Sequence, residues 1–394
     1  MPLIHNVLNR FSHANFFTTI DLTKAYHQIP VSEEHISKTA VITPIGLFEY
    51  KFMPFGLRNA AQTFQRFIDQ LLFTSSCALA YIDDILIGSA DLESHQRDVT
   101  EIFKILNLNK LQINLNKCVF CEKEVKFLGH FISGDGVRPL PTRLETITNF
   151  PLPKTTSQLR SFLGTINYCH RFIPKVSEVL APMSALCNRP KHAEVKWNES
   201  ALAAFDLAKK ALLNIQTLSF PQEDFPFTLT TDASNIAIGA VLHQVNDEFS
   251  KPLEFYSKKL SATQQRYSTF DRELLAVHLS LKHFRYLLEG RVFTIFTDHK
   301  PLVHLLDMKD PSPRQQRQIS FISEFNCTVQ HISGKDNIIA DCLSRNVCAI
   351  SHNPLFTSEI LRGITLSAEE ITDFGDSYVF QDGIHCDSAL SGTL

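Results

Sequence analysis

The chain has 394 residues, 44% of them hydrophobic and 10% aromatic, so it can bury the cores of two or three globular domains. Its formal charge of −3 gives no overall basic surplus of the kind that phosphate binding usually shows, and no apolar run approaches the roughly 20 residues of a membrane span. Nine cysteines at irregular spacing, without a signal peptide, indicate a reducing, intracellular setting, either cytoplasmic or nuclear.

The charge is unevenly distributed along the chain. Residues 346–394 hold seven carboxylates against one arginine, whereas the other 345 residues hold 37 basic and 34 acidic side chains. The body of the protein is therefore mildly basic, and it is followed by an acidic tail in which little ordered structure is expected.

Helices and strands are mixed in the first third of the chain. Strands are expected at residues 78–82 and 85–88, with Asp83 and Asp84 as the turn of a hairpin between them, and a second amphipathic helix at 94–106. A first amphipathic helix is indicated by five apolar residues that share one helix face: Phe64, Phe67, Ile68, Leu71 and Leu72.

Four prolines between residues 139 and 153 then mark a linker or subdomain edge, followed by helical segments near 157–168 and 199–213. After Pro221 the pattern becomes three strands followed by alternating helices and strands. The expected elements are strands 227–231, 236–243 and 253–257, a long helix 264–287, strand 292–297, helices, strand 327–332 and a short final helix.

Three acids in the first part of the chain follow strand-like runs. Asp21 comes after Phe16, Phe17 and Ile20, while Asp83 and Asp84 come after residues 79–82. Phosphoryl transfer through two metal ions needs carboxylates that can hold the ions about 3.5–4 Å apart, and Mg²⁺ prefers such oxygen ligands. We call Asp21, Asp83 and Asp84 the first acid set; for the paired acids alone, a simple polar turn is an equally good interpretation.

The first acid set lies within a longer series of motifs. The blocks are Phe17–Gln28, Phe52–Ala60, Tyr81–Asp84 and Phe127–His130. In order and spacing they resemble the palm of a reverse transcriptase from a gypsy-type LTR retrotransposon.

That resemblance implies a role for each matching residue. Asp21 and Asp83 would be the shared metal ligands and Asp84 a more peripheral acid, while Tyr26 would lie under the incoming sugar and exclude a 2′-hydroxyl. Tyr26 and Phe55 could instead be packing aromatics. The resemblance also implies a nucleotide-binding group, Phe55, Gly56, Arg58 and Gln62 with Tyr26, and a primer-binding group, Phe127, Leu128, Gly129 and His130, in which Gly129 would allow close approach of a backbone.

A second group of acids follows at intervals of 41, 25 and 43 residues. We call these four residues the second acid set: Asp232, Glu273, Asp298 and Asp341. A single acid at a strand end is more often a solvated or capping group. Embedded in strands and helices in this order, however, the four resemble the ribonuclease H domain that follows reverse transcriptase in the same elements, and His331 resembles the loop histidine of retroviral ribonucleases H, although a surface histidine remains the plainer interpretation.

The resemblance covers about 345 residues and predicts a multidomain protein of α+β and α/β class. The expected parts are a palm with a mixed sheet and helices (1–134), a helical thumb/connection (135–221), a ribonuclease H-like domain with a mixed five-stranded sheet (222–345) and a divergent acidic tail (346–394). The implied cofactor is Mg²⁺, with Mn²⁺ as an alternative. The implied partners are an RNA template, a DNA primer, RNA–DNA hybrids and deoxynucleoside triphosphates, with no membrane and with the oligomeric state left open.

Two short motifs are expected to have no catalytic role. Cys118 and Cys121 form a lone pair without the further ligands of a zinc site and are interpreted as buried thiols. Gly134-Asp135-Gly136 is interpreted as a turn and not as a phosphate-binding loop.

The sequence thus predicts an RNA-directed DNA polymerase with a ribonuclease H that degrades the RNA of hybrids. Only twenty residues precede Asp21, without the basic fingers hairpin of family polymerases, so we expect N-terminal truncation to impair polymerisation. The alternative is a domesticated or decayed retroelement protein that binds nucleic acid without catalysis.

Overall fold

The computed structural model describes residues 9–213, 215, 217–245, 250–308, 310–332, 378–381 and 384–387. The chain divides into two compact units, Met1–Asn346 and Val347–Leu394. Within the second unit, β15 (Tyr378–Gln381) and β16 (Ile384–Asp387) form an antiparallel hairpin, which the sequence did not predict in the acidic tail.

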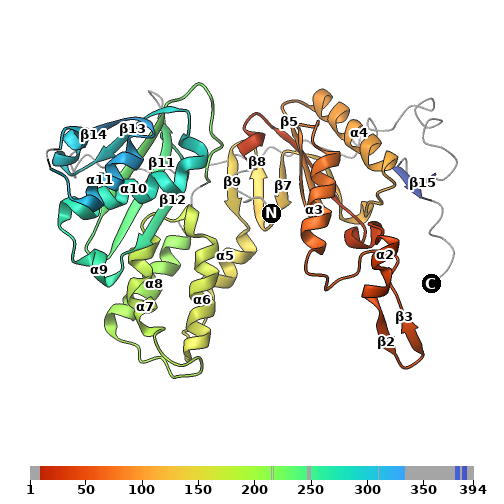
Figure 1. Ribbon diagram of the computed structural model, residues 1–394, viewed down its shortest axis with the longest axis horizontal. Coiled ribbons are helices and arrows are strands. Elements are labelled where there is room, and N and C mark those ends of the chain that lie inside the picture. Colours follow the sequence, from red (N-terminus) through yellow and green to blue (C-terminus); the bar gives the residue numbers. More distant parts are fainter. Residues whose placement is uncertain are drawn as a thin grey trace. The chain divides into compact units, whose positions relative to one another are not determined.

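The first part of the larger unit is built on a four-stranded antiparallel sheet of order β4-β5-β1-β6 (Figure 1). The helices α3 and α4 pack against it, and Phe64, Ile68, Ile85 and Ile102 are fully buried between them. The elements are β1 (Phe16–Asp21), α3 (Ala60–Leu71), β4 (Ala78–Tyr81), β5 (Asp84–Ser89), α4 (Leu92–Leu108) and β6 (Val119–Glu122). The predicted helices and strands of this region are confirmed, since apolar spacing determines which face each element buries.

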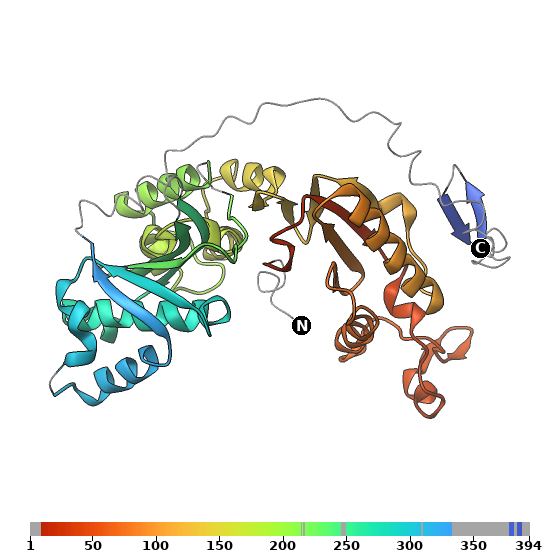
Figure 2. The same cartoon turned by 90° about the horizontal axis from the view of Figure 1, so that it is seen from above.

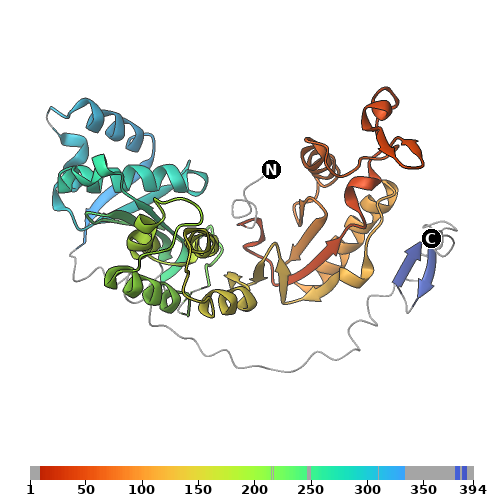
Figure 3. The same cartoon turned by 90° about the horizontal axis from the view of Figure 1, so that it is seen from below.

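A short hairpin was not predicted. It consists of β2 (Val41–Thr43) and β3 (Gly46–Phe48), follows the short helix α2 (Glu33–Ile36) and projects from the rest of the first part (Figures 1 and 3). Its apolar side chains are exposed. A strand is usually recognised from alternating apolar and polar residues, and this hairpin has no buried apolar face to produce that alternation.

A three-stranded sheet and four helices connect the two halves of the unit. Phe162 and Phe205 from the helices share one continuous core with Phe17 of the first sheet and with Val241 and Phe255 of the last. The elements are β7 (Glu124–Phe127), β8 (His130–Ser133), β9 (Gly136–Pro139), α5 (Pro141–Thr148), α6 (Thr156–Tyr168), α7 (Val176–Leu186) and α8 (Glu199–Leu213). Gly134 and Asp135 form the β8–β9 turn as predicted.

The last part contains the predicted mixed five-stranded sheet, and its strand order is β12-β11-β10-β13-β14. The first two neighbouring pairs are antiparallel and the last two parallel, and α10 packs along the sheet (Figure 2). The elements are β10 (Phe227–Ala233), β11 (Ala237–Val245), β12 (Ser250–Lys259), α9 (Ala262–Gln265), α10 (Thr269–Leu288), β13 (Val292–Thr297), the 3-10 helix η6 (Lys300–Asp307), α11 (Pro313–Ile322) and β14 (Asn326–His331).

Three predictions need correction. The long helix 264–287 is two helices, because Ser268 accepts a hydrogen bond from the Asp271 N–H and begins α10 as its N-cap. Asp83 and Asp84 do not form the hairpin turn together: Ile82 and Asp83 form it, and Asp84 begins β5. Cys118 and Cys121 are free thiols that are only partly buried.

No helix of the described residues is both long enough and apolar enough to cross a membrane.

A buried carboxylate joins the connecting segment to the five-stranded sheet. Glu254 of β12 is only 3% exposed and accepts hydrogen bonds from the Tyr286 hydroxyl at 2.6 Å and from His283 Nε2 at 3.0 Å, while Arg171 lies 3.8 Å away. Burial alone would raise the pKa of Glu254, but the hydrogen bonds from His283 and Tyr286 and the charges of Arg171 and His283 together outweigh burial and lower the pKa to about 2. The buried charge depends on all three partners.

We therefore predict that Tyr286→Phe destabilises the protein. A hydrogen bond to a charged group contributes about 1.5–3 kcal/mol, and we expect the free energy of unfolding to fall by that amount in urea titrations. Tyr50→Phe is the control, because Tyr50 is 42% exposed and should change stability by less than about 0.5 kcal/mol. Equal effects of the two variants would contradict the role of the Glu254 network.

Candidate functional site

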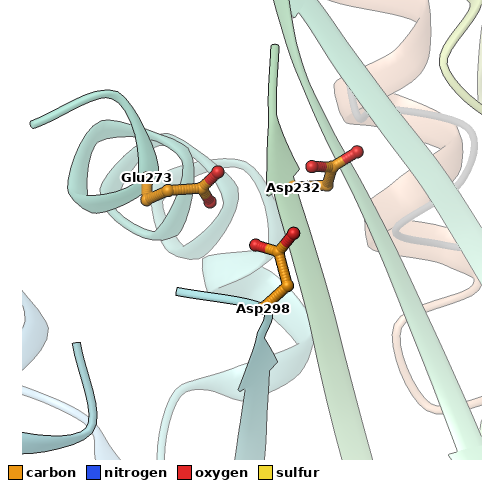
Figure 4. Close-up of side chains that lie close together, drawn as sticks. All are labelled: Asp232, Glu273 and Asp298. Atoms are coloured by element: carbon orange, nitrogen blue, oxygen red, sulfur yellow. The ribbon is translucent and has the colours of Figure 1, made fainter. Parts of the chain in front are cut away.

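Three members of the second acid set meet at one end of β10 and β13 (Figure 4). The two strands are parallel, with Thr231 opposite Thr297, so the next residues, Asp232 and Asp298, lie side by side. Glu273 reaches them from α10. One ligand oxygen from each acid lies within 4.8 Å of the others, close enough for carboxylates to share divalent ions.

Glu273 is the buried member of this group, with 3% of its surface exposed. The Ala233 N–H donates a hydrogen bond to Glu273 Oε1 at 3.1 Å, while Oε2 is buried and has no hydrogen-bond partner. Burial, followed by the charges of Asp298 and Asp232, raises the pKa of Glu273 to about 8. Because an unpartnered buried carboxylate oxygen is costly, the arrangement fits a bound cation.

A lysine from the connecting segment also contacts this group. Lys175, the residue before α7, forms an ion pair with Asp232. Burial opposes the charge of Lys175, but the hydrogen bond to Asp232 and the charges of nearby acids, Asp232 first, together outweigh burial and raise the pKa of Lys175. The sequence did not single out this residue: its partner is 57 residues away and no spacing pattern links them.

The other two residues predicted for this site are Asp341 and His331. Asp341 lies outside the described residues. His331 is the last residue of β14; it is exposed and stands opposite Thr297, immediately before Asp298. The strand pairing therefore places His331 close to Asp298, but the His331 ring does not belong to the group of three converging side chains.

The first acid set lies at the end of β1 and at the β4–β5 turn. Asp21 stands directly opposite Asp84 in the antiparallel β1–β5 pair, and the Leu22 N–H donates to the Asp83 carbonyl at 2.9 Å. Burial, followed by the charges of Asp83 and Asp21, raises the pKa of Asp84. The backbone thus brings the three acids together.

The carboxylates of the first acid set converge less tightly than those of the second. Within the part of the chain that the structure describes, only Asp232, Glu273 and Asp298 place their oxygens within 4.8 Å of one another. Lys117 donates to Asp21 at 3.4 Å, on the side of β1 away from β5 in the sheet order. Mutual repulsion acts against closer approach of the acids, and the Lys117 charge offsets part of it at Asp84.

Of the predicted nucleotide-binding residues, Tyr26 lies near Asp83 of the first acid set, and Phe55 packs against Tyr26. Tyr26 packs edge-on against Phe55 and Phe64, with ring centroids at 5.5 and 5.9 Å, and its pKa is raised by burial and by the charge of Asp83. Phe55 is 70% exposed, so it is not a core residue. Gly56, Arg58 and Gln62 are also exposed and accessible to a ligand.

The predicted primer-binding residues are divided between core and turn. Phe127 and His130 are 3% and 6% exposed, and His130 stacks on Tyr168, so both side chains belong to the protein core. Leu128 and Gly129 form the turn between β7 and β8, with positive φ angles of 47° and 82°. A Cβ on Gly129 would lie 2.5 Å from the Tyr168 hydroxyl, so glycine is required there for close approach of this side chain.

Comparison with known families assigns the two halves. The model for reverse transcriptase (RNA-dependent DNA polymerase) matches residues 2–132, and the model for the RNase H-like domain found in reverse transcriptase matches residues 222–325. The chain therefore contains a reverse transcriptase domain followed by an RNase H-like domain.

Curated relatives give the wider family. The chain is 38% identical over 347 residues to the retrovirus-related Pol polyprotein from transposon 297 of Drosophila melanogaster, and 36% identical over 354 residues to the transposon Tf2-3 polyprotein of Schizosaccharomyces pombe. Each match covers 88% of this chain but only 32% and 26% of the relatives, so the chain spans about a third of their length or less. The chain is a region of a retrotransposon Pol polyprotein with reverse transcriptase and RNase H-like domains, as its resemblance to gypsy-type elements predicts.

Solved structures share the fold. The foamy viral protease-reverse transcriptase in complex with an RNA/DNA hybrid superposes with a TM-score of 0.73 at 20% identity, covering 91% of this chain and 49% of that one. The same type of protein in complex with double-stranded DNA gives 0.74 at 21% identity, covering 85% and 72%. The predicted fold class is thereby confirmed.

The raised pKa of Glu273 predicts how stability changes with pH when divalent ions are removed. The folded protein holds this proton up to about pH 8, whereas the ordinary pKa is 4.5, so the free energy of unfolding should fall as pH rises between these values. Since one pKa unit corresponds to about 1.4 kcal/mol, the loss amounts to a few kcal/mol. Glu273→Gln stays neutral and should be more stable than the unaltered protein at pH 9 in chelator, but not at pH 4.

Thermal unfolding at several pH values measures this difference. The control is Glu49→Gln, because Glu49 is exposed. A Glu273→Gln variant that loses stability with rising pH as steeply as the unaltered protein would show that Glu273 is not the group responsible.

Proposed function

We propose that the chain is an RNA-directed DNA polymerase and a ribonuclease that cuts the RNA of RNA–DNA hybrids, with separate acid sets for the two reactions. The convergence of Asp232, Glu273 and Asp298 around the unpartnered Glu273 Oε2 carries the proposal. Phosphoryl chemistry of this kind requires several acids at one point, and a purely structural role gives no reason to bury an unsatisfied carboxylate oxygen among other acids.

The residues of the second acid set fit hard divalent ions. Mg²⁺, or Mn²⁺ in its place, would supply neutralisation of charge on the attacking and leaving oxygens of the RNA phosphate. Asp232, Glu273 and Asp298 would hold the ions, with Asp341 as the fourth acid, and His331 would act beside them at the end of β14. Lys175, which pairs with Asp232, would have to leave that carboxylate as a metal ion binds.

The first acid set would serve nucleotide addition. Asp21 and Asp83 would hold the metal ions, with Asp84 as the more peripheral acid. The Tyr26 ring, fixed by Phe55 and Phe64, would stand where a 2′-hydroxyl must be excluded. Arg58 and Gln62 are exposed and would contact the nucleotide and the template, and the Leu128–Gly129 turn would contact the primer.

The fold supports nucleic acid as the partner. Its structural relatives are complexes with an RNA/DNA hybrid and with double-stranded DNA, and we propose the same duplexes, together with an RNA template, a DNA primer and deoxynucleoside triphosphates, as partners of this chain. A binding protein without catalysis is the competing function; the looser first acid set favours it for the polymerase half only.

We predict that single substitutions separate the two activities. Asp232→Asn removes a ligand of the second acid set and should reduce hybrid cleavage in Mg²⁺ at least about 100-fold. Loss of a residue that only supports a metal ligand costs about 10–100-fold, and loss of the ligand itself should cost more. Asp83→Asn should abolish primer extension on an RNA template and leave cleavage unchanged. Both activities are measured on the 394-residue chain.

The control is Asp206→Asn, because Asp206 is exposed and lies on α8, outside both matched regions. Hybrid binding without cleavage above the Asp232→Asn level would favour the non-catalytic alternative. Loss of both activities in either variant would contradict two separate acid sets.

A further inference from the structure

The turn that presents Asp83 has an unusual backbone. Ile82 has a φ angle of 55°, in the left-handed region that β-branched residues avoid. Such a conformation persists only where its surroundings hold it. Because Ile82 lies between Tyr81 at the end of β4 and Asp83 of the first acid set, whatever stabilises its conformation also determines where Asp83 lies.

A buried amide of α3 holds this turn. The Ile82 N–H donates to Gln65 Oε1 at 2.8 Å, and Gln65 Nε2 donates to the Ala80 carbonyl at 2.9 Å. Gln65 is 4% exposed, and its neighbours on α3, Phe64 and Ile68, are fully buried in the core under the sheet. One side chain therefore bridges the end of β4 and the turn from a fixed helix.

The orientation of that amide is set by a third contact. Gln65 Nε2 also donates to Asp69 Oδ1 at 2.8 Å, one helical turn further along α3. With two acceptors on one side and the Ile82 N–H on the other, only one orientation of the amide satisfies all three hydrogen bonds. Asp69 thus keeps the carbonyl oxygen of Gln65 directed at the turn.

We propose that Gln65 is a positioning residue for the first acid set: by clamping Ile82 it fixes the turn in which Asp83 meets Asp21 and Asp84. The other side of the turn is held by β1, where the Leu22 N–H donates to the Asp83 carbonyl at 2.9 Å. The turn is therefore fixed from the helix by Gln65 and from the sheet by the residue that follows Asp21. This inference rests on the proposed metal-binding role of the first acid set.

The test compares Gln65→Met with Gln70→Met in the full chain. Methionine has a similar shape to glutamine but cannot form the three hydrogen bonds, and Gln70 lies on the same helix with an exposed side chain. In Gln65→Met we expect faster hydrogen exchange of the Ile82 amide and about 10–100-fold slower primer extension, the usual loss when a partner of a metal ligand is removed. Hybrid cleavage and the Gln70→Met variant should match the unaltered protein within about twofold.

A milder variant, Asp69→Ala, keeps the test informative if Gln65→Met misfolds. Asp69→Ala alters an exposed side chain and removes only the contact that orients the amide, so it should show a smaller change in the same direction. Unchanged extension together with unchanged Ile82 exchange in both Gln65→Met and Asp69→Ala would overturn the positioning role. A loss of stability without a change in extension would overturn it as well.

A separate measurement distinguishes this inference from the proposed polymerase function. Mn²⁺ binding to the first acid set is measured in an Asp232→Asn background, where the second acid set is weakened. If the unaltered chain does not extend primers, the polymerase proposal fails, whereas Gln65 is still supported by a roughly tenfold loss of Mn²⁺ affinity in Gln65→Met. Equal affinity in both proteins, or no Mn²⁺ binding by the first acid set, would overturn the role of Gln65.

Discussion

Electrostatic repulsion among carboxylates that the backbone forces together is the constraint on which both candidate sites depend. Parallel pairing of β10 and β13 places Asp232 beside Asp298, and the packing of α10 buries Glu273 against them. Burial and, after it, this repulsion raise the pKa of Glu273, and Lys175 offsets part of the negative charge by pairing with Asp232. A fold that keeps such a cluster gains most when divalent cations bind it.

The two acid sets satisfy this constraint differently. The second is built from a strand, a helix and a strand end that share the core of one sheet, so its side chains converge without help from the substrate. The first depends on a turn in a strained conformation, held by Gln65 and by the Leu22 N–H. Binding of metal, nucleotide and primer would be needed to draw Asp21, Asp83 and Asp84 into the same proximity.

Much of the architecture could be predicted from the sequence because apolar spacing and punctuation are local signals. The face of α3, the strands on either side of the β4–β5 turn and the succession of strands β10 to β14 along the chain follow from residues near one another in the sequence. The positions of the acids could be predicted because the order and spacing of the motifs along the chain mark them. The burial of Phe127 and His130 could not, since the same motif letters suit a binding turn or a core.

Contacts between residues far apart in the chain could not be predicted, because no local pattern in the sequence links the two partners. Lys175 reaches Asp232 only after the connecting helices and the five-stranded sheet have joined one core, and Gln65 meets Ile82 only when α3 packs on β4. The second acid set is tested most directly by anomalous diffraction from Mn²⁺ in crystals of the chain with an RNA–DNA hybrid. We expect peaks among Asp232, Glu273 and Asp298, with Lys175 displaced from Asp232; an ordered site with Lys175 still paired and no peak would contradict a metal-binding role of these acids.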